Sequence, residues 1–89
     1  MDMRIEDRVF VVTGAGSGIG REISLRFADA GARIAAVDLN GESAEETVSL
    51  LGGTGHFAAT VDVSDGGSVV EMFQKVDAEY GRVDGLVNN

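Results

Sequence analysis

The chain has 89 residues and a formal net charge of −8, with 15 acidic side chains against 7 Lys and Arg. An acidic chain with Lys75 as its single lysine is expected to bind nucleic acid poorly, because phosphate contacts need clustered Lys and Arg. The absence of cysteine excludes disulfide scaffolds, cysteine-based zinc sites and thiolate catalysis. No apolar run approaches the ~18 residues of a membrane span, and the amino terminus lacks a signal-peptide core. We therefore expect a cytoplasmic protein of one domain, or part of one, that binds neither membrane nor nucleic acid.

The apolar pattern predicts strands that alternate with helices along the whole chain. The expected strands are Val9 to Thr13, Arg33 to Asp38, Phe57 to Val63 and Val83 to Asn88. The expected helices run from Ile19 to about Ala30-Gly31, from about Glu42 to Leu51, and from Ser64 or Asp65 to Gly81. This alternation predicts an α/β fold with a parallel sheet. A doubly wound domain normally continues beyond a fourth strand, so we expect residues 1–89 to be its first half.

The strongest motif is the glycine-rich turn T-G-A-G-S-G-I-G at residues 13–20, which joins the first strand to the first helix. Such a turn lets the backbone contact a pyrophosphate and presents N–H groups at a helix N-terminus. A Cβ at Gly14 or Gly18 would obstruct that approach, and Gly20 would allow the helix to pack closely on the strand. A glycine-rich turn without any ligand is the alternative interpretation.

Asp38 ends the second predicted strand, 18 residues after Gly20. A carboxylate at this place can accept hydrogen bonds from the ribose diol of an adenosine. It would also repel a 2′-phosphate, and neither Ser17 nor Leu39 supplies a compensating positive charge. The pattern therefore favours NAD over NADP, with a solvated strand-end acid as the alternative for Asp38.

The spacing of the glycines distinguishes between classes of nucleotide binder. The pattern G-x-G-x-x-G would need glycine where Ile19 or Arg21 stands, and no Gly-Lys-Ser/Thr of a P-loop is present. A methyltransferase-type loop usually has an acid two residues before its first glycine, where this chain has Val12. The spacing fits T-G-x-x-x-G-x-G, and a methyltransferase-like half domain stays a weaker alternative.

At this point the chain resembles the N-terminal half of a short-chain dehydrogenase/reductase of the NAD-preferring type. The resemblance covers the whole chain through motifs in the family's order: residues 13–20, Val37-Asp38, D-V-S-D at 62–65, and Y-G-R-V-D-G-L-V-N-N at 80–89. The last motif resembles the beginning of the family's N-N-A-G. The resemblance implies a Rossmann-type doubly wound parallel sheet, with strand order 3-2-1-4 in residues 1–89, and NAD as the cofactor.

The resemblance also implies roles for individual residues. Residues near the pyrophosphate and the adjacent ribose would be Gly14, Ser17, Gly18 and Ile19, with Gly20 closing the turn. Asp62 and Val63 would contact the adenine, and Asn89 would lie near the cofactor ribose. The alternatives are a turn acid at Asp62 and a pair of strand-end hydrogen-bonding residues at Asn88 and Asn89.

Family members catalyse hydride transfer with a Ser, a Tyr-x-x-x-Lys pair and an Asn that all follow the N-N-A-G motif. Here the residue four after Tyr80 is Asp84, and Lys75 precedes Tyr80, so we expect no catalytic residue in this chain. Tyr80 is expected in the core, and His56 is expected to be structural, without a metal. The expected function is the NAD(H)-binding part of an oxidoreductase that moves a hydride between NAD and an alcohol or carbonyl substrate. A non-catalytic nucleotide-binding or regulatory module, or a truncated inactive product, is the alternative.

The first half of a doubly wound sheet leaves apolar surface uncovered. Its strands read as buried on both faces, yet only one helix would lie on the second face. Leu86 and Val87 would stand on the free edge of the fourth strand, and such edges promote association. We therefore expect an isolated chain that is aggregated, partly molten or held in a larger assembly, and that binds NAD weakly at best. For the complete protein we expect a homo-oligomer.

Overall fold

The computed structural model describes residues 5–89, in which seven elements alternate between strand and helix. In chain order they are β1 (Val9–Thr13), α1 (Gly18–Asp29), β2 (Arg33–Asp38), α2 (Gly41–Leu50), β3 (Phe57–Thr60), α3 (Gly66–Tyr80) and β4 (Gly85–Val87). Each predicted strand and helix is present, so the predicted α/β class is confirmed.

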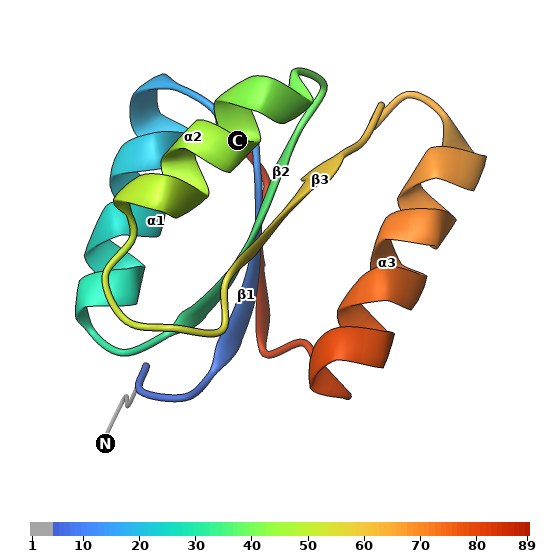
Figure 1. The fold of residues 1–89 in the computed structure, drawn as a ribbon. Helices are drawn as coiled ribbons and strands as arrows, with labels where there is room; N and C mark the ends of the chain where they lie inside the picture. The colour runs from blue at the N-terminus through green and yellow to red at the C-terminus, as the bar shows by residue number, and fades with distance from the viewer. Residues whose placement is uncertain (1–4) are drawn as a thin grey trace.

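All four strands pair in parallel, in the order β3-β2-β1-β4. This is the predicted 3-2-1-4 order, so the predicted Rossmann-type strand order is confirmed. Because the strands are parallel, their carboxyl ends share one edge, which lies at the top of Figure 1. In α/β sheets ligands bind at this edge.

The third and fourth strands are shorter than the predicted Phe57 to Val63 and Val83 to Asn88. Val61 still donates its N–H to the Asp38 carbonyl (3.0 Å), but the Asp65 N–H then bonds the Asp62 carbonyl (3.0 Å). This turn leads the chain away from the sheet toward α3, although the apolar residues continue as far as Val63.

Helices α1 and α2 lie on one face of the sheet and α3 lies on the other (Figure 1). Val9 and Val11 of β1 are fully buried in the cluster beneath α3. Val12 belongs to the opposite cluster, beneath α1 and α2, with Phe10 packed against it. This alternation explains why the strands are apolar at successive positions: both faces are covered.

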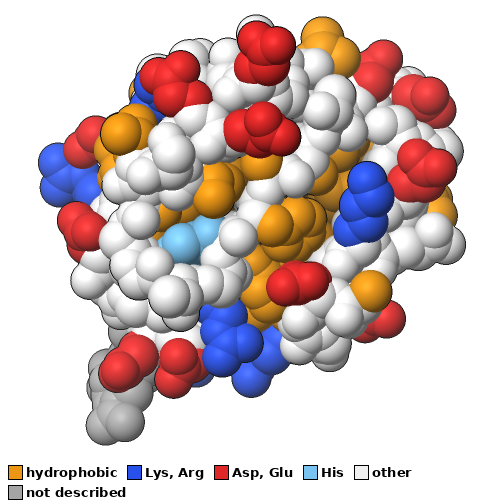
Figure 2. All heavy atoms as spheres, viewed as in Figure 1, with side chains coloured by type: hydrophobic (Ala, Val, Ile, Leu, Met, Phe, Trp, Pro, Cys, Tyr) orange, Lys and Arg blue, Asp and Glu red, His pale blue; other side chains and the backbone are white. Residues whose placement is uncertain are grey.

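The two outer strands leave apolar surface at the sides of the sheet. Figure 2 shows apolar side chains in a furrow between α2 and α3, where β3 has its free edge. On the other side of the sheet, Leu86 of β4 is 53% exposed, in agreement with the prediction that one edge of the fourth strand is free. None of the helices in residues 5–89 has the length and apolar character needed to cross a bilayer.

Candidate functional site

A cleft of about 210 Å³ opens at the carboxyl ends of the strands. Its lining contains five of the residues expected to bind a cofactor: Gly14, Asp38, Asp62, Val63 and Asn89. The other expected residues, Ser17, Gly18, Ile19 and Gly20, lie outside this lining, at the start of α1. The fold therefore brings residues from four separate parts of the chain to one edge of the sheet.

The glycine-rich turn has left-handed backbone at Gly14 (φ +62°) and Gly18 (φ +55°). A Cβ on Gly18 would meet no atom within 4 Å, so the space in front of α1 is open. A Cβ on Gly20 would lie 2.2 Å from the Gly14 carbonyl oxygen, so only glycine allows α1 to pack this closely. The predicted packing role of Gly20 agrees with this geometry, although its close neighbour is the turn itself.

The N-terminus of α1 differs from those of the other two helices. Asn40 caps α2 by accepting a hydrogen bond from the Ser43 N–H (3.2 Å), and Asp65 caps α3 by accepting one from the Gly67 N–H (3.0 Å). Ser17 precedes α1 without a side-chain capping bond, and the first turn of α1 contains no acid. The first N–H groups of a helix and its dipole attract anions, so this end of α1 suits a phosphate.

Asp38 lies directly against the glycine-rich turn. Its Oδ2 accepts a hydrogen bond from the Gly16 N–H (2.8 Å), and its Oδ1 accepts one from the Asn40 N–H (3.0 Å). A carboxylate has about four acceptor positions, so capacity for a ribose diol remains. Gly16 was not assigned to the site from the sequence. The structure requires glycine there, because a Cβ would lie 2.8 Å from Asp38 Oδ2.

On the far side of the cleft, Asp62 Oδ1 accepts hydrogen bonds from the hydroxyl (2.6 Å) and the N–H (2.9 Å) of Ser64. These bonds, the hydroxyl first, hold the pKa of Asp62 below its usual range. Three large apolar side chains at this end of the molecule are strongly exposed: Ile19 (69%), Leu39 (71%) and Val63 (65%). Apolar surface beside a few placed polar groups is typical of a small-molecule site. Leu39 was not predicted to contribute, and its place directly after Asp38 is the signal that could have indicated it.

Thr13 and the last residues of the chain close the cleft between β1 and β4. The Asn89 N–H donates to Thr13 Oγ1 (2.9 Å), and Asn89 Nδ2 donates to the Gly14 carbonyl (3.4 Å). The Thr13 hydroxyl lies 3.3 Å from both the Val87 carbonyl and Asn88 Oδ1. The asparagines therefore tie the two strands together, which was the structural alternative for them, and they also line the cleft.

Tyr80 and His56 lie at the other end of the strands from the cleft, near the amino ends of β2 and β3. The Tyr80 hydroxyl donates to the Gly55 carbonyl, and burial, followed by nearby Glu79, raises the pKa of this phenol to about 12. His56 Nδ1 accepts a hydrogen bond from the Ile34 N–H (3.0 Å). Both side chains serve the fold, as predicted. Within residues 5–89, no three His, Cys, Asp or Glu side chains are grouped to hold a metal ion.

Comparison with known proteins gives the class that this fold and cleft define. The sequence profile of the short chain dehydrogenase family matches residues 8–89. The chain belongs to this family.

Among its relatives, D-threitol dehydrogenase of Mycolicibacterium smegmatis is 49% identical in an alignment that covers 99% of this chain and 35% of that protein. The (3R)-3-hydroxyacyl-CoA dehydrogenase of Canis lupus familiaris is 43% identical in an alignment that covers 96% of this chain and 36% of that protein. The chain thus spans about a third of the length of these curated relatives.

Solved structures of dehydrogenases and reductases have the same fold over nearly the whole of this chain. A hydroxysteroid dehydrogenase from Escherichia coli superposes with a TM-score of 0.89 at 35% identity, over 97% of this chain and 37% of that one. A 3-ketoacyl-(acyl-carrier-protein) reductase from Brucella melitensis, solved in complex with NADH, gives a TM-score of 0.86 at 32% identity, over 92% of this chain and 34% of that one.

Proposed function

We propose that residues 1–89 form the NAD(H)-binding part of a short-chain oxidoreductase that transfers a hydride between NAD and an alcohol or carbonyl substrate. The observation that carries this proposal is the contact of Asp38 with the glycine-rich turn, through the Gly16 N–H at 2.8 Å. Through this contact, the acid that we propose for the ribose lies beside the helix end that we propose for the phosphate. The NADH-bound reductase from Brucella melitensis supports the use of a nicotinamide cofactor.

The residues present fit a dinucleotide. The uncapped start of α1 and the open space at Gly18 suit the pyrophosphate. Asp38 would accept hydrogen bonds from the adenosine ribose, while Asp62 and Val63 would contact the adenine. When bound, the nicotinamide supplies the hydride acceptor or donor. The residues of this chain bind and orient the cofactor.

The charges around the cleft favour NAD over NADP. Beside the cleft lies a wider hollow of about 790 Å³ that shares Asp38 with it and is also lined by Glu42 and Glu45. No Lys or Arg from the described part of the chain lines either space. A 2′-phosphate near Asp38 would therefore face like charges without a cation.

The test is titration calorimetry of NAD and NADP with the protein as expressed from its own gene. Wild type should bind NAD at least about tenfold more tightly, which corresponds to ~1.4 kcal/mol. Asp38→Asn removes the charge at nearly constant size and should narrow or reverse that preference. Asp77→Asn, at an exposed position on α3, is the matched control and should leave it unchanged. Wild type that binds NADP as tightly as NAD would refute the assignment.

We further propose that catalysis depends on residues outside 1–89, because the single Tyr and the single Lys of this chain do not form Tyr-x-x-x-Lys. The gene beyond the codon for Asn89 should then encode Ala-Gly, followed by the serine and the Tyr-x-x-x-Lys motif. A gene without them would favour a non-catalytic nucleotide-binding module. Dehydrogenase activity of residues 1–89 alone would contradict the proposal.

A further inference from the structure

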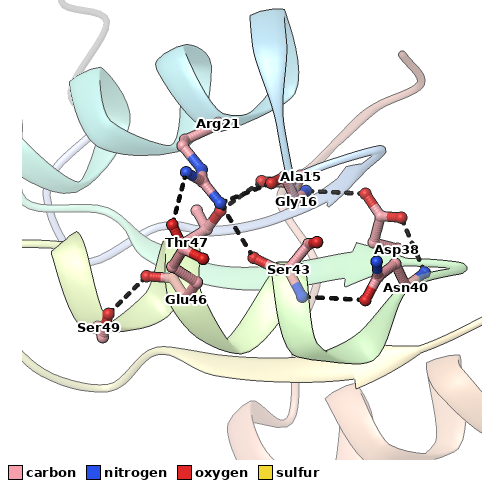
Figure 3. A network of polar contacts seen from close by, with 9 residues as sticks. All are labelled: Ala15, Gly16, Arg21, Asp38, Asn40, Ser43, Glu46, Thr47 and Ser49. Atoms are coloured by element: carbon pink, nitrogen blue, oxygen red, sulfur yellow. Dashed lines mark hydrogen bonds and ion pairs between the residues drawn. The ribbon is translucent and has the colours of Figure 1, made fainter.

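A second group of contacts holds the glycine-rich turn from the side of α2 (Figure 3). Arg21, in the first turn of α1, donates from Nη2 to the Gly16 carbonyl (2.6 Å) and from Nε to Thr47 Oγ1 (2.9 Å). The Thr47 hydroxyl in turn donates to the Ala15 carbonyl (2.7 Å), and Thr47 is fully buried. Two side chains from different helices thus hold two successive carbonyls of the turn.

These contacts complete the hydrogen bonding of Ala15 and Gly16. The Ala15 N–H donates to the Val37 carbonyl (3.0 Å), and the Gly16 N–H donates to Asp38 (2.8 Å). With both carbonyls also bonded, each backbone polar group of the two residues has a partner. The segment that immediately precedes the N–H groups of α1 is therefore fixed on both sides.

Neither side chain is explained by the stability of its own helix. The guanidinium of Arg21 lies in the first turn of α1, where the helix dipole disfavours a cation. Thr47 is a β-branched residue inside α2 with a buried hydroxyl, which is a poor helix former. The polar atoms of both residues are instead used on the turn, which indicates a role there.

We propose that Arg21 and Thr47 are positioning residues that hold the carbonyls of Ala15 and Gly16 against α2, so that a diphosphate meets the N–H groups at the start of α1 rather than these carbonyl oxygens. This inference rests on the proposed function, because it assigns the turn to the diphosphate of a nucleotide. Asp38 bonds the same peptide segment, so the ribose-binding acid and the phosphate-binding turn share one support.

The experiment compares the affinities of adenosine and ADP for the protein as expressed from its own gene. Adenosine lacks the diphosphate. The dissociation constant of adenosine divided by that of ADP therefore isolates the contribution of the turn. Thr47→Val removes the hydroxyl without changing charge, and should reduce this ratio by about tenfold, the effect of losing one or two hydrogen bonds. Arg21→Met keeps the aliphatic stem and should act in the same direction. Because the Arg21 side chain is 25% exposed, this variant keeps the test open if Thr47→Val does not fold.

Two controls separate positioning from general destabilisation. Thr47→Ser retains the hydroxyl and should keep the wild-type ratio. Glu46→Gln removes the charge of the exposed carboxylate that accepts from Arg21 Nη1 (3.1 Å) without touching the turn, and should also keep the wild-type ratio. In the absence of nucleotide, amide exchange at Gly16 should be faster in Thr47→Val than in Thr47→Ser.

The outcomes distinguish a failure of the positioning role of Arg21 and Thr47 from a failure of the proposed nucleotide-binding function. If wild type does not bind ADP, the proposed function fails and the inference fails with it. If wild type binds ADP but Thr47→Val and Arg21→Met weaken adenosine and ADP equally, or weaken neither, only the positioning role is overturned. A selective loss of the diphosphate contribution, restored by Thr47→Ser, supports it.

Discussion

Gly20 provides the sharpest test of how closely α1 approaches the glycine-rich turn. Gly20→Ala would normally stabilise a helix, since alanine is favoured over glycine by ~1 kcal/mol in a helix interior. Here its Cβ would lie 2.2 Å from the carbonyl oxygen and 2.7 Å from the carbonyl carbon of Gly14. We therefore expect the opposite sign, a loss of stability.

The magnitude follows from the distances. Ordinary contact begins near 3.4 Å, so backbone atoms of the turn or of α1 must move by more than 1 Å. Overpacking of this kind costs about 1–3 kcal/mol, and the upper value applies because backbone cannot rotate away as a side chain can. After the gain in helix propensity, a net destabilisation of about 2 kcal/mol remains.

Urea denaturation measures this difference directly. With a denaturant slope of about 2 kcal/mol per molar, the midpoint should fall by about 1 M. Gly66→Ala is the matched control, because Gly66 begins α3 and a Cβ there would meet no atom within 4 Å. That variant should be as stable as wild type or more stable. A Gly20→Ala protein at least as stable as wild type would refute the close packing of α1 on the turn.

Three further predictions concern Tyr80, Asp84 and Leu86, which lie outside the cleft. Tyr80→Phe removes the hydrogen bond from the Tyr80 hydroxyl to the Gly55 carbonyl, and should lower the free energy of unfolding in urea by about 1 kcal/mol. It should leave NAD affinity unchanged, and a weaker affinity would contradict a purely structural role. The hydrogen bond from Arg82, followed by that from the Val9 N–H, holds the pKa of Asp84 below its usual range. The stability from this carboxylate should be present above an unfolded-state pKa of ~3.9 and lost as pH falls through the lower folded-state pKa. Asp84→Asn should therefore make the urea midpoint less dependent on pH in the acid range. A dependence equal to that of wild type would contradict this prediction. Leu86→Lys should reduce association of residues 1–89 in analytical ultracentrifugation, whereas a monomeric wild-type chain would show that the exposed edge does not drive association.

Elements whose sequence signals are local were predicted well. The stripe that includes Val76 indicated α3, and Gly81 ends that helix in left-handed backbone (φ +71°), as its position suggested. Asp38 was found because an acid after a buried strand must lie at the carboxyl edge of a parallel sheet. The alternation of elements predicted a parallel sheet, and the resemblance to short-chain dehydrogenases implied its strand order.

Features that depend on tertiary packing were not predicted. Arg21 and Thr47 are 26 residues apart, and neither residue has a local pattern that joins it to the glycine-rich turn. Gly16 looked like a variable position of the motif, since its need for glycine arises from Asp38 and Ser43 folding against it. The end of β3 was placed too late because the apolar pattern continues through Val63 after the backbone has turned away from the sheet.

The contact between Thr13 and Asn89 has a consequence for the order in which the site assembles. The bond from Gly16 to Asp38 closes a loop of 22 residues, whereas that from Asn89 to Thr13 closes one of 76. For a flexible chain, the longer loop costs about 1 kcal/mol more in closure entropy. Contacts of high sequence separation also form slowly. During synthesis the glycine-rich turn and its acid can therefore pair from β1, α1 and β2 alone, while the wall of the cleft at β4 can form only after residues 85–89 have also been synthesised.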